Sequence, residues 1–459
     1  MTQRQDATLN NLENSAEALE GLVYTCLRKL YGEEPHDDVH ARVENELAII
    51  RAGKYEATLI AAQKLMQSSL DAGYLAGARG LATSSFVAFL LGITDANPLQ
   101  AHYRCPECKH TVFIAESGYG CGADLPDEIC SLCGADYTKN GFDTPYQNFF
   151  GINGEKIPNI DLSFAVEYQP TAQEEAVKLF GKDKVFALHP ESENEPSVVT
   201  IHFEQDALLK LRLLNHDALS MLKHMQDTTG VDPRTIPLDD PQTIQLICAA
   251  DTNGVPEFGT KFMRELILAT KPTTLNDLIR LYCFGHGADV WLNNANDLIL
   301  GGTAKVREVI SCRDDIFNYL TDKGMDEQMA YAIMDDVRKG RGLKPEWATE
   351  MMAFGVPDWY IESCQKIRYL SPRSHAVAYV TMAFRIAWFK AHHPVAFYNA
   401  YFAILAKEFD TSVLHLGAEN VQTRIEELSS NPNLSKEDGK TLQHLKVGYE
   451  VCLCGVDVV

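Results

Sequence analysis

Two short runs of apolar, β-prone residues constrain the fold of this chain more than any other feature. The runs span residues 158–164 and 208–217. Successive side chains of a strand point to opposite faces, so Asn159 and Asp161 share one face of the first run. Arg212 is the polar residue at the inward-pointing position of the second run. Apolar strands that carry a polar residue at an inward-pointing position can present that side chain to metal ions.

Along the chain, the pattern changes from mixed to helical. Residues 18–91 have apolar positions at helical spacing, and residues 101–150 are rich in turns. Strand-like runs fill residues 157–215, apart from a polar loop at 191–196. From residue 217 onward, helical patterns dominate and are broken at intervals by Gly and Pro. The sequence therefore predicts an α/β region followed by a mostly α-helical region.

Four cysteines in the turn-rich segment have the spacing of a metal site. Two Cys-x-x-Cys knuckles, separated by 21 residues, are formed by Cys105, Cys108, Cys130 and Cys133. Two thiolates from each knuckle would complete a closed tetrahedral zinc site, which leaves no open position for catalysis. We therefore expect a zinc-ribbon insertion with one structural zinc ion. Cys121 could compete as a ligand, and four free thiols in a degenerate ribbon are the alternative.

Charge and hydropathy limit the class of partner. The formal net charge of -22 at pH 7 argues against a protein that coats nucleic acids, although a local basic groove is compatible with it. Residues 1–20 are polar and partly acidic, unlike a secretory signal, and the longest apolar run, 86–93, is too short to cross a bilayer. We expect a cytoplasmic protein without a membrane partner, in which the 12 cysteines are thiols or metal ligands rather than disulfides.

Several separate motifs, taken in chain order, resemble one family. They are Gly73-Tyr-Leu-Ala-Gly-Ala-Arg-Gly80, Ser84-Ser-Phe-Val87, the two cysteine knuckles, Pro256-Glu-Phe-Gly259, His286-Gly-Ala-Asp-Val-Trp291, Ser311-Cys-Arg-Asp-Asp315 and Pro372-Arg-Ser-His-Ala-Val-Ala-Tyr379. Together with the two strand runs, they resemble the PolC-type α subunit of bacterial DNA polymerase III, a C-family replicative DNA polymerase. The resemblance covers nearly the whole chain and implies the palm and fingers portion only.

The fold that this resemblance implies is a nucleotidyltransferase-like α/β palm with an inserted zinc ribbon, followed by mostly α-helical fingers. The expected parts are an N-terminal helical part of the palm with a glycine loop (1–100), the zinc-ribbon insertion (101–150), the remainder of a shortened palm (151–230) and the fingers (231–459). We expect a shortened palm because Phe186 is followed almost at once by the strand that carries Arg212, where the family has a substantial further segment.

The resemblance also implies the chemistry, DNA-directed nucleotidyl transfer with Mg²⁺ ions held by aspartates. This chain has Asn159 and Arg212 at two of the three aspartate positions, so only Asp161 keeps a carboxylate. At about 4 Å and an effective dielectric of about 20, each pair of unit charges is worth about 4 kcal/mol, so an inward Arg212 repels a divalent ion by about 8 kcal/mol. We therefore expect a pseudoenzyme with impaired or lost activity, in which Arg212 forms a partly buried pair with Asp161.

Two other functions stay open at this point. If Arg212 swings outward and Glu204 or Asp206 supplies a carboxylate, the chain is a minimal active DNA polymerase whose metals are held by other carboxylates or by a partner. Alternatively, it is an interaction module that meets proteins of the replication machinery. The sequence alone leaves the assignment as an enzyme undecided.

Finally, the resemblance implies which residues contact nucleotide and DNA. Nucleotide or phosphate contacts are expected from Arg79, Ser84, Ser85, Arg373, His375 and Tyr379, and DNA contacts from His286, Arg338, Lys339 and Arg341. Arg and His would contact phosphates, and Tyr would stack on a base. Aromatic residues at helical spacing are also typical of a core, and basic residues are also typical of a solvated surface. Because the net charge is strongly negative, we expect only weak binding of DNA primer-template.

Overall fold

The structure is a computed structural model that describes residues 15–114, 118–188, 198–202 and 210–456. Its contacts divide the chain into two compact units. The first unit contains residues up to Phe164, Tyr168–Asn215 and Thr274–Tyr379. The second contains Ala165–Glu167, His216–Thr273 and Val380–Val459. Neither unit is continuous in sequence, and the boundaries expected at residues 100, 150 and 230 stay a prediction.

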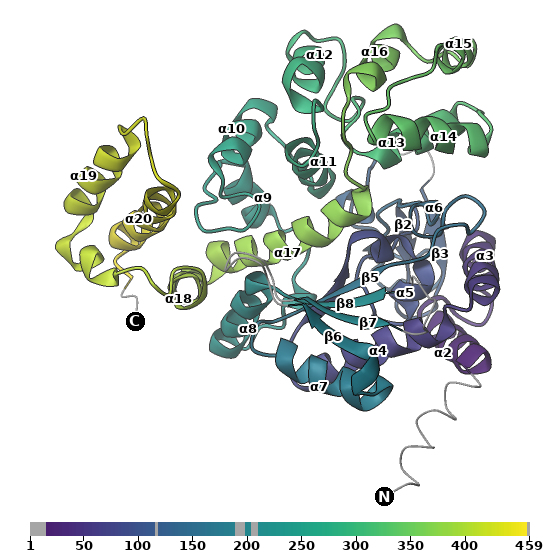
Figure 1. Ribbon diagram of the computed structural model, residues 1–459, viewed down its shortest axis with the longest axis horizontal. Coiled ribbons are helices and arrows are strands. Elements are labelled where there is room, and N and C mark those ends of the chain that lie inside the picture. Colours follow the sequence, from purple (N-terminus) through teal and green to yellow (C-terminus); the bar gives the residue numbers. More distant parts are fainter. Residues whose placement is uncertain (1–14, 115–117, 189–197, 203–209, 457–459) are drawn as a thin grey trace, which may run out of the picture. The chain divides into compact units, whose positions relative to one another are not determined.

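A five-stranded sheet forms the centre of the first unit (Figure 1). Its strands, in spatial order, are β1 (Ala76–Arg79), β5 (Ile160–Phe164), β8 (Lys210–Asn215), β7 (Val198–His202) and β6 (Val185–Leu188). The pair β5–β8 is parallel and the other pairs are antiparallel. Both runs that the sequence marked as strands therefore lie side by side at the centre of the sheet.

The two faces of this sheet differ in polarity because side chains alternate along each strand. Ile160 and Leu162 on β5, together with Leu211 and Leu213 on β8, are at most 1% exposed. Helices α4 (Glu56–Asp71) and α7 (Gln169–Phe180) pack against the sheet and against each other (Figure 1). Asp161 and Arg212 alternate with these aliphatic residues and point to the other face of the sheet, where they are less buried. That face of the two strands is therefore polar.

The remaining helices of the first unit flank this sheet or follow it in the chain. They are α2 (Ser15–Tyr31), α3 (Asp37–Gly53), α5 (Phe86–Leu90), α6 (Gln147–Phe150), α11 (Leu275–Gly285), α12 (Asn296–Leu300), α13 (Arg313–Asp322), α14 (Glu327–Arg338), α15 (Pro345–Ala353) and α16 (Asp358–Lys366). Helix α17 (Arg373–His392) contributes its first residues to this unit and the rest to the second.

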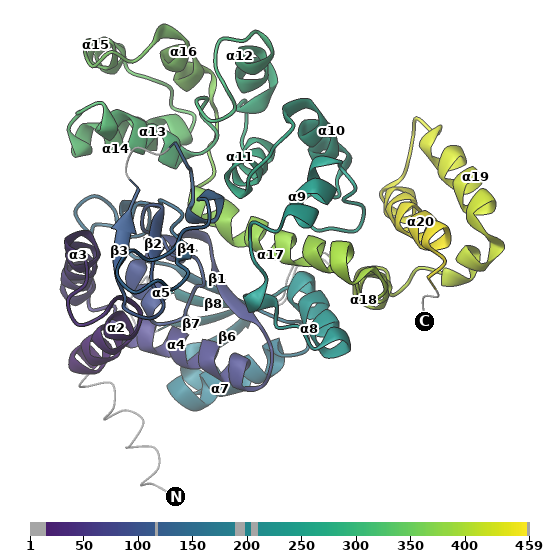
Figure 2. The same cartoon turned by 180° about the vertical axis from the view of Figure 1, so that it is seen from behind.

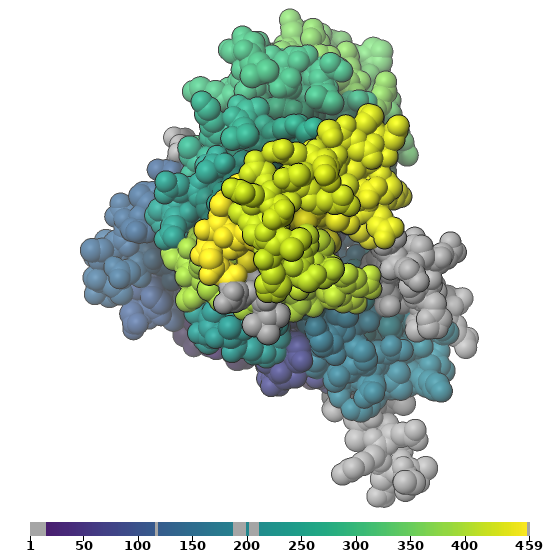
Figure 3. All heavy atoms as spheres, turned by 90° about the vertical axis from the view of Figure 1, so that its left-hand side faces the viewer, coloured from purple at the N-terminus to yellow at the C-terminus, as the bar shows by residue number. Residues whose placement is uncertain are grey.

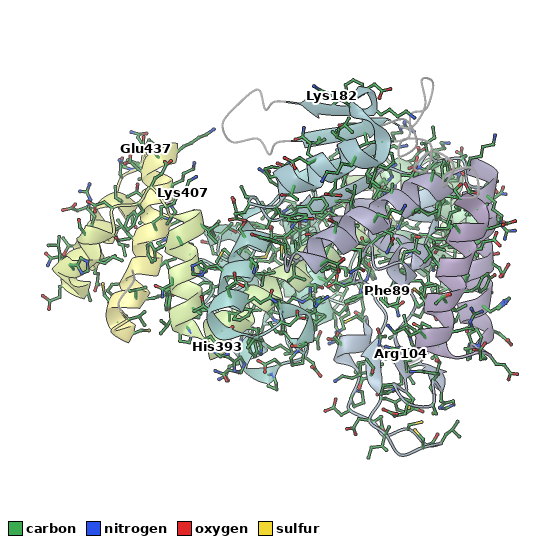
Figure 4. The ribbon with its side chains drawn as sticks, turned by 90° about the horizontal axis from the view of Figure 1, so that it is seen from below. Phe89, Arg104, Lys182, His393, Lys407 and Glu437 are labelled. Atoms are coloured by element: carbon green, nitrogen blue, oxygen red, sulfur yellow. The ribbon has the colours of Figure 1, made fainter. Side chains whose placement is uncertain are left out.

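An insertion with its own small sheet follows α5. Its strands are ordered β3 (Thr111–Phe113), β2 (His102–Arg104) and β4 (Thr138–Asn140), as Figure 2 shows. The core of the insertion is small, because its buried apolar cluster consists of Ala101, Tyr103 and Leu125. Arg104, labelled in Figure 4, anchors the insertion by donating to the backbone oxygen of Leu30 at 3.2 Å.

The second unit is built from helices. Besides the end of α17, it contains α8 (Asp217–Thr229), α9 (Pro241–Cys248), α10 (Lys261–Thr270), α18 (Pro394–Ala400), α19 (Ala418–Ser429) and α20 (Lys436–Cys454). His393, labelled in Figure 4, lies where α17 ends and α18 begins. Helices α18 and α8 pack together, and α19 packs against α20 on the surface drawn in yellow in Figure 3.

The expected succession of a mixed α/β part and a helical second half is therefore confirmed. None of the described helices is both long and apolar enough to cross a membrane. The polar loop at 191–196, together with Glu204 and Asp206, lies outside the described residues.

Candidate active site and metal centre

One row of register partners crosses the polar face of the five-stranded sheet. Asp161 on β5 is the partner of Arg79 on β1 and of Arg212 on β8. Arg212 is in turn the partner of Thr200 on β7. Partners directly opposite each other in a ladder point to the same face, with Cβ atoms about 5 Å apart. Asp161 is consequently flanked by two arginines.

Arg212 holds Asp161 in a two-pronged ion pair. Its Nε atom donates to Oδ1 at 2.5 Å and its Nη2 atom donates to Oδ2 at 2.6 Å. The expected pairing of these residues is confirmed, but the Arg212 side chain is 44% exposed, more than the sequence suggested, while that of Asp161 is 20% exposed. Asn159, just before β5, is exposed. Both carboxylate oxygens already accept a charged donor, so this arrangement does not fit a pair of Mg²⁺ ions.

The palm also lacks a group of metal ligands among the residues that the structure describes. Within the described residues, the only group of three or more Asp, Glu, His or Cys side chains close enough to share an ion is the cysteine quartet. Two-metal nucleotidyl transfer needs several carboxylates to hold both ions. The described part of the sheet offers Asp161 without such partners.

The glycine loop approaches Asp161 from β1. Gly80 has a φ of +72°, and a Cβ atom added to it would lie 3.9 Å from Asp161 Oδ2. The following turn is held by Glu46 on α3, which is fully buried and accepts hydrogen bonds from the Ser85 hydroxyl at 2.6 Å and the Phe86 N–H at 2.9 Å. Ser84 is also fully buried, and its hydroxyl has no hydrogen-bond partner among the described residues.

Several expected contact residues meet in one aromatic cluster within the first unit. The guanidinium of Arg79 lies over the Tyr379 ring, 4.5 Å from its centroid. The Tyr379 ring lies 4.5 Å from that of His375 and stacks at 5.7 Å on that of Tyr282. Tyr282 stacks in turn on the exposed His286 ring at 3.8 Å. The structure thus brings Arg79, His375, Tyr379 and His286 together.

His375 contributes no positive charge to this cluster at neutral pH. Burial, followed by the charges of His286 and Arg79, lowers its pKa to about 4. A neutral imidazole can still donate or accept a hydrogen bond. Arg79, which is only 7% exposed, carries a positive charge in this cluster at pH 7.

Arg373 lies away from the solvent. Its side chain is 5% exposed, and its Nε atom donates to the backbone oxygen of Phe142 at 2.8 Å. Its Nη2 atom donates at 2.6 Å both to the backbone oxygen of Gly120 and to Asn276 Oδ1. These contacts fasten the start of α17 to the insertion and to α11. The expected phosphate contact of Arg373 stays a prediction.

The basic stretch after α14 is paired with carboxylates of its own helix. Arg338 and Lys339 both bind Asp335, at 2.6 and 2.5 Å. Arg341 binds Asp336 at 3.1 Å. These partly exposed pairs reduce the positive potential that the stretch offers to DNA.

The four cysteines of the insertion form a compact group. All four sulfurs lie within 4.8 Å of one another, with Cys105 Sγ 3.4 Å from Cys133 Sγ and Cys108 Sγ 3.5 Å from Cys130 Sγ. A tetrahedral zinc ion with Zn–S bonds of about 2.3 Å places its sulfurs about 3.8 Å apart, so the residues fit that ion. The N–H of Cys108 points to Cys105 Sγ at 3.4 Å, as in a metal knuckle.

Cys121 is separate from this group. It is fully buried, burial raises its pKa, and it is not among the four sulfurs that gather in the insertion. The competing ligand considered from the sequence is therefore not at the site.

Sequence reasoning missed Tyr282 and Glu46. Tyr282 precedes His286 by four residues on α11, a spacing that places two side chains on one helix face, so the sequence held a usable signal for it. Glu46 is different because its role depends on the Ser85 turn, about forty residues away in the chain, and no local pattern reveals that contact.

Two family models match successive parts of the chain, and the second of them includes residues of both compact units. Residues 17–192 match the family described as the bacterial DNA polymerase III alpha NTPase domain. Residues 216–355 match the family described as the bacterial DNA polymerase III alpha subunit finger domain.

Curated relatives extend this similarity over nearly the whole chain. The "DNA polymerase III PolC-type" of Halalkalibacterium halodurans is 38% identical over 527 residues, which cover 96% of this chain and 37% of the relative. That of Thermotoga maritima is 38% identical, covering 97% and 39%, and that of Bacillus subtilis is 36% identical, covering 98% and 37%.

The chain thus spans less than two fifths of the length of these relatives. The matched stretch of 527 residues is longer than the whole chain of 459, so the relative has residues within that stretch that this chain lacks. The shortened palm expected from the sequence stays a prediction.

Proposed function

The chain belongs to the PolC-type family of bacterial DNA polymerase III α subunits, and from this membership we propose that it keeps a DNA-binding palm and fingers framework with impaired or lost nucleotidyl transfer. Family membership alone does not decide whether this chain is an active polymerase. The observation that carries it is the ion pair between Arg212 and Asp161. The Arg212 guanidinium lies beside Asp161, where a divalent ion would need further carboxylate ligands.

Charge explains why this substitution opposes catalysis. With both Asp161 oxygens engaged by Arg212, an incoming Mg²⁺ ion has to displace a two-pronged donor and then remain beside its positive charge. Phosphoryl transfer also needs positive charge that stabilises the negative charge of the phosphoryl group during its transfer. An arginine on the sheet can attract phosphate oxygens, but it does not supply the Lewis-acid chemistry that bound metal ions would supply there.

Weak DNA binding is the retained activity in this proposal. The aromatic cluster of Arg79, Tyr379, His375, Tyr282 and His286 combines a cation with stacked rings, which are the groups that hold nucleic acid bases and phosphates. The net charge of -22 and the internal ion pairs of Arg338, Lys339 and Arg341 weaken long-range attraction to DNA. Binding should therefore fall steeply as salt is raised.

We also propose that the cysteine quartet is a structural zinc site. Cys105, Cys108, Cys130 and Cys133 would hold one ion, and four sulfur ligands leave no position for water or substrate. The ion would supply a cross-link between the two knuckles of an insertion whose own apolar core is small.

Two alternatives remain distinct from this proposal. In a minimal active polymerase, carboxylates such as Glu204 and Asp206, which lie outside the described residues, or a partner would restore the metals. In an interaction module, proteins of the replication machinery would be the ligands and DNA would not bind. The first alternative predicts primer extension, and the second predicts no DNA binding.

Primer extension with a labelled primer-template, in Mg²⁺ and separately in Mn²⁺, tests the proposal. We expect no extension with either ion, together with weak DNA binding by fluorescence anisotropy that is lost at higher salt. Asp161→Ala is the control for contamination, because extension by a contaminating polymerase would survive it. Extension that disappears in Asp161→Ala would establish the active alternative, and undetectable DNA binding at low salt would favour the interaction module.

A further inference from the structure

A buried arginine outside the palm has no partner for one edge of its guanidinium. Arg313, the first residue of α13, is 4% exposed, and its Nε and Nη2 atoms have no hydrogen-bond acceptor among the described residues. Its backbone N–H is satisfied, because it donates to the oxygen of Ser371 at 3.2 Å. Leaving a charged donor edge buried and unpaired is costly, so such an edge points to an absent acceptor.

The unpaired edge is the one that suits an oxyanion. In Arg212, the same Nε and Nη2 atoms grip both oxygens of the Asp161 carboxylate. This edge presents two parallel donors, whose spacing matches two oxygens of a carboxylate or of a phosphate group. Arg313 therefore presents the geometry of a two-pronged anion contact without its anion.

Two other cations, Lys156 and Arg338, lie close enough to Arg313 for their charges to interact with it. Lys156 lies over the ring of Tyr331, 5.0 Å from its centroid, and burial, followed by the charges of Arg313 and Arg338, lowers the pKa of Lys156 to about 8. The charge that acts most strongly on Arg313 is the favourable one of Asp314, and Arg338 follows as a like charge. We call Arg313, Lys156, Arg338 and Tyr331 the Arg313 cluster. Its cations repel one another within a strongly acidic protein, and an anion placed among them would relieve that repulsion.

Neighbouring carboxylates are committed elsewhere. Asp314 accepts from Asn148 Nδ2 at 2.6 Å and from the backbone N–H of Arg373 at 2.8 Å. Asp335 binds Arg338 and Lys339. Glu155 accepts from the backbone N–H groups of Ile152 and Asn153 at 3.3 and 2.8 Å. The protein's own acids therefore do not fill the place beside Arg313.

We propose that the Arg313 cluster is a binding site for a phosphate-class oxyanion, gripped by the Nε and Nη2 edge of Arg313 and contacted by Lys156. A phosphate fits better than a carboxylate because it carries more negative charge and more acceptor oxygens for the two cations, Arg313 and Lys156. Lys156 and Arg338 are only partly buried, so the anion approaches from their side. The phosphate belongs either to a nucleic acid backbone or to a free phosphate ion.

Calorimetric titration of the whole chain with inorganic phosphate, against chloride at matched ionic strength, tests the site. We expect binding that weakens about 10-fold or more in Arg313→Gln and in Lys156→Gln. Lys366→Gln, which removes an exposed cation from α16, is the matched control and should leave binding unchanged. Lys156 is partly exposed, so its variant remains decisive if Arg313→Gln fails to fold.

Competition with a single-stranded oligodeoxynucleotide identifies the source of the phosphate. If the same two substitutions weaken DNA binding and phosphate competes with DNA, the site holds the nucleic acid backbone. If phosphate binds and DNA binding is unaffected by both substitutions, the site holds the free ion. Absence of any phosphate-specific binding to the unmodified chain, or equal binding by Lys156→Gln and the Lys366→Gln control, would overturn the proposal. The site does not depend on polymerase activity, so a primer-extension result leaves it unaffected.

Discussion

Asp161 and Arg212 are register partners on the parallel strands β5 and β8, and their side chains meet in a two-pronged ion pair on the polar face of the sheet. Register makes this contact inevitable, because opposed residues of neighbouring strands project to the same side. A carboxylate at position 212 would face Asp161 with a like charge and would need a metal between them. With Arg212 in that position, the charge of Asp161 is balanced without a metal ion.

The strength of this pair follows from its exposure. Arg212→Ala should lower the free energy of unfolding by about 1 kcal/mol, because the pair has good geometry but the arginine is nearly half exposed. This is less than the cost of about 3–5 kcal/mol that is typical of losing one partner of a buried pair. Asp161→Ala made in the Arg212→Ala background should cost little more. Urea unfolding of the two single variants and the double variant measures the coupling, and strictly additive costs would contradict it.

Restoring the carboxylates should restore metal affinity before activity. We expect the double substitution Asn159→Asp with Arg212→Asp to raise Mn²⁺ and Mg²⁺ affinity at least about 10-fold, because three carboxylates would then share one face of β5 and β8. Calorimetric titration with Mn²⁺ measures the gain. Arg212→Ala alone is the control, because it removes the cation without adding a ligand. Equal affinity in the control and the double variant would show that the positions do not converge on an ion.

The pairing of Asp161 with Arg212 was predictable because alternation along two strands and a family resemblance placed both residues. The rest of the row was not. Arg79 and Thr200 join it only through the strand order β1-β5-β8-β7, which is not the order of the chain, and no sequence pattern specifies it. Register across non-consecutive strands depends on tertiary packing rather than on local propensity.

The basic stretch and Arg373 differ in how far their contacts can be predicted from the sequence. Asp335 lies three and four residues before Arg338 and Lys339, a helical spacing that indicates their pairing. Arg341 lies five residues after Asp336 and beyond the end of α14, so this spacing does not indicate its pair. The burial of Arg373 depends on carbonyl groups 231 and 253 residues away, at Phe142 and Gly120. A contact of that kind cannot be read from local sequence.

The zinc prediction follows from the cysteine geometry. Purified protein should carry about one zinc ion per chain, and Cys130→Ser should release it and unfold the insertion without unfolding the sheet, because the remaining core of the insertion is small. Elemental analysis and hydrogen exchange over residues 101–150 measure the two effects. Cys121→Ser, in the same segment but outside the quartet, should keep the metal. Fully folded protein without metal would refute the assignment.

Acid should destabilise the protein partly through His375. Because the folded pKa is about 4 and the ordinary value is 6.5, the unfolded chain takes up a proton first as the pH falls. The contribution is fully present above pH 6.5 and is lost progressively toward pH 4, and a shift of this size corresponds to about 3 kcal/mol. His375→Gln should flatten the dependence of unfolding free energy on pH in that window. The exposed His415→Gln is the control, and equal slopes in all three proteins would contradict the prediction.

Arg373 distinguishes a structural from a phosphate-binding role. Arg373→Lys keeps the charge, but a single ammonium cannot reach the oxygens of Phe142, Gly120 and Asn276 together. Buried acceptors would lose their donors, so we expect the free energy of unfolding to fall by about 2–4 kcal/mol. The exposed Arg368→Lys is the matched control and should change it by less than about 0.5 kcal/mol. If instead Arg373 contacts a phosphate in solution, Arg373→Lys should weaken DNA binding in anisotropy measurements while urea unfolding stays unchanged. The buried position of its guanidinium, with all three acceptors at 2.6 to 2.8 Å, makes loss of stability the expected result.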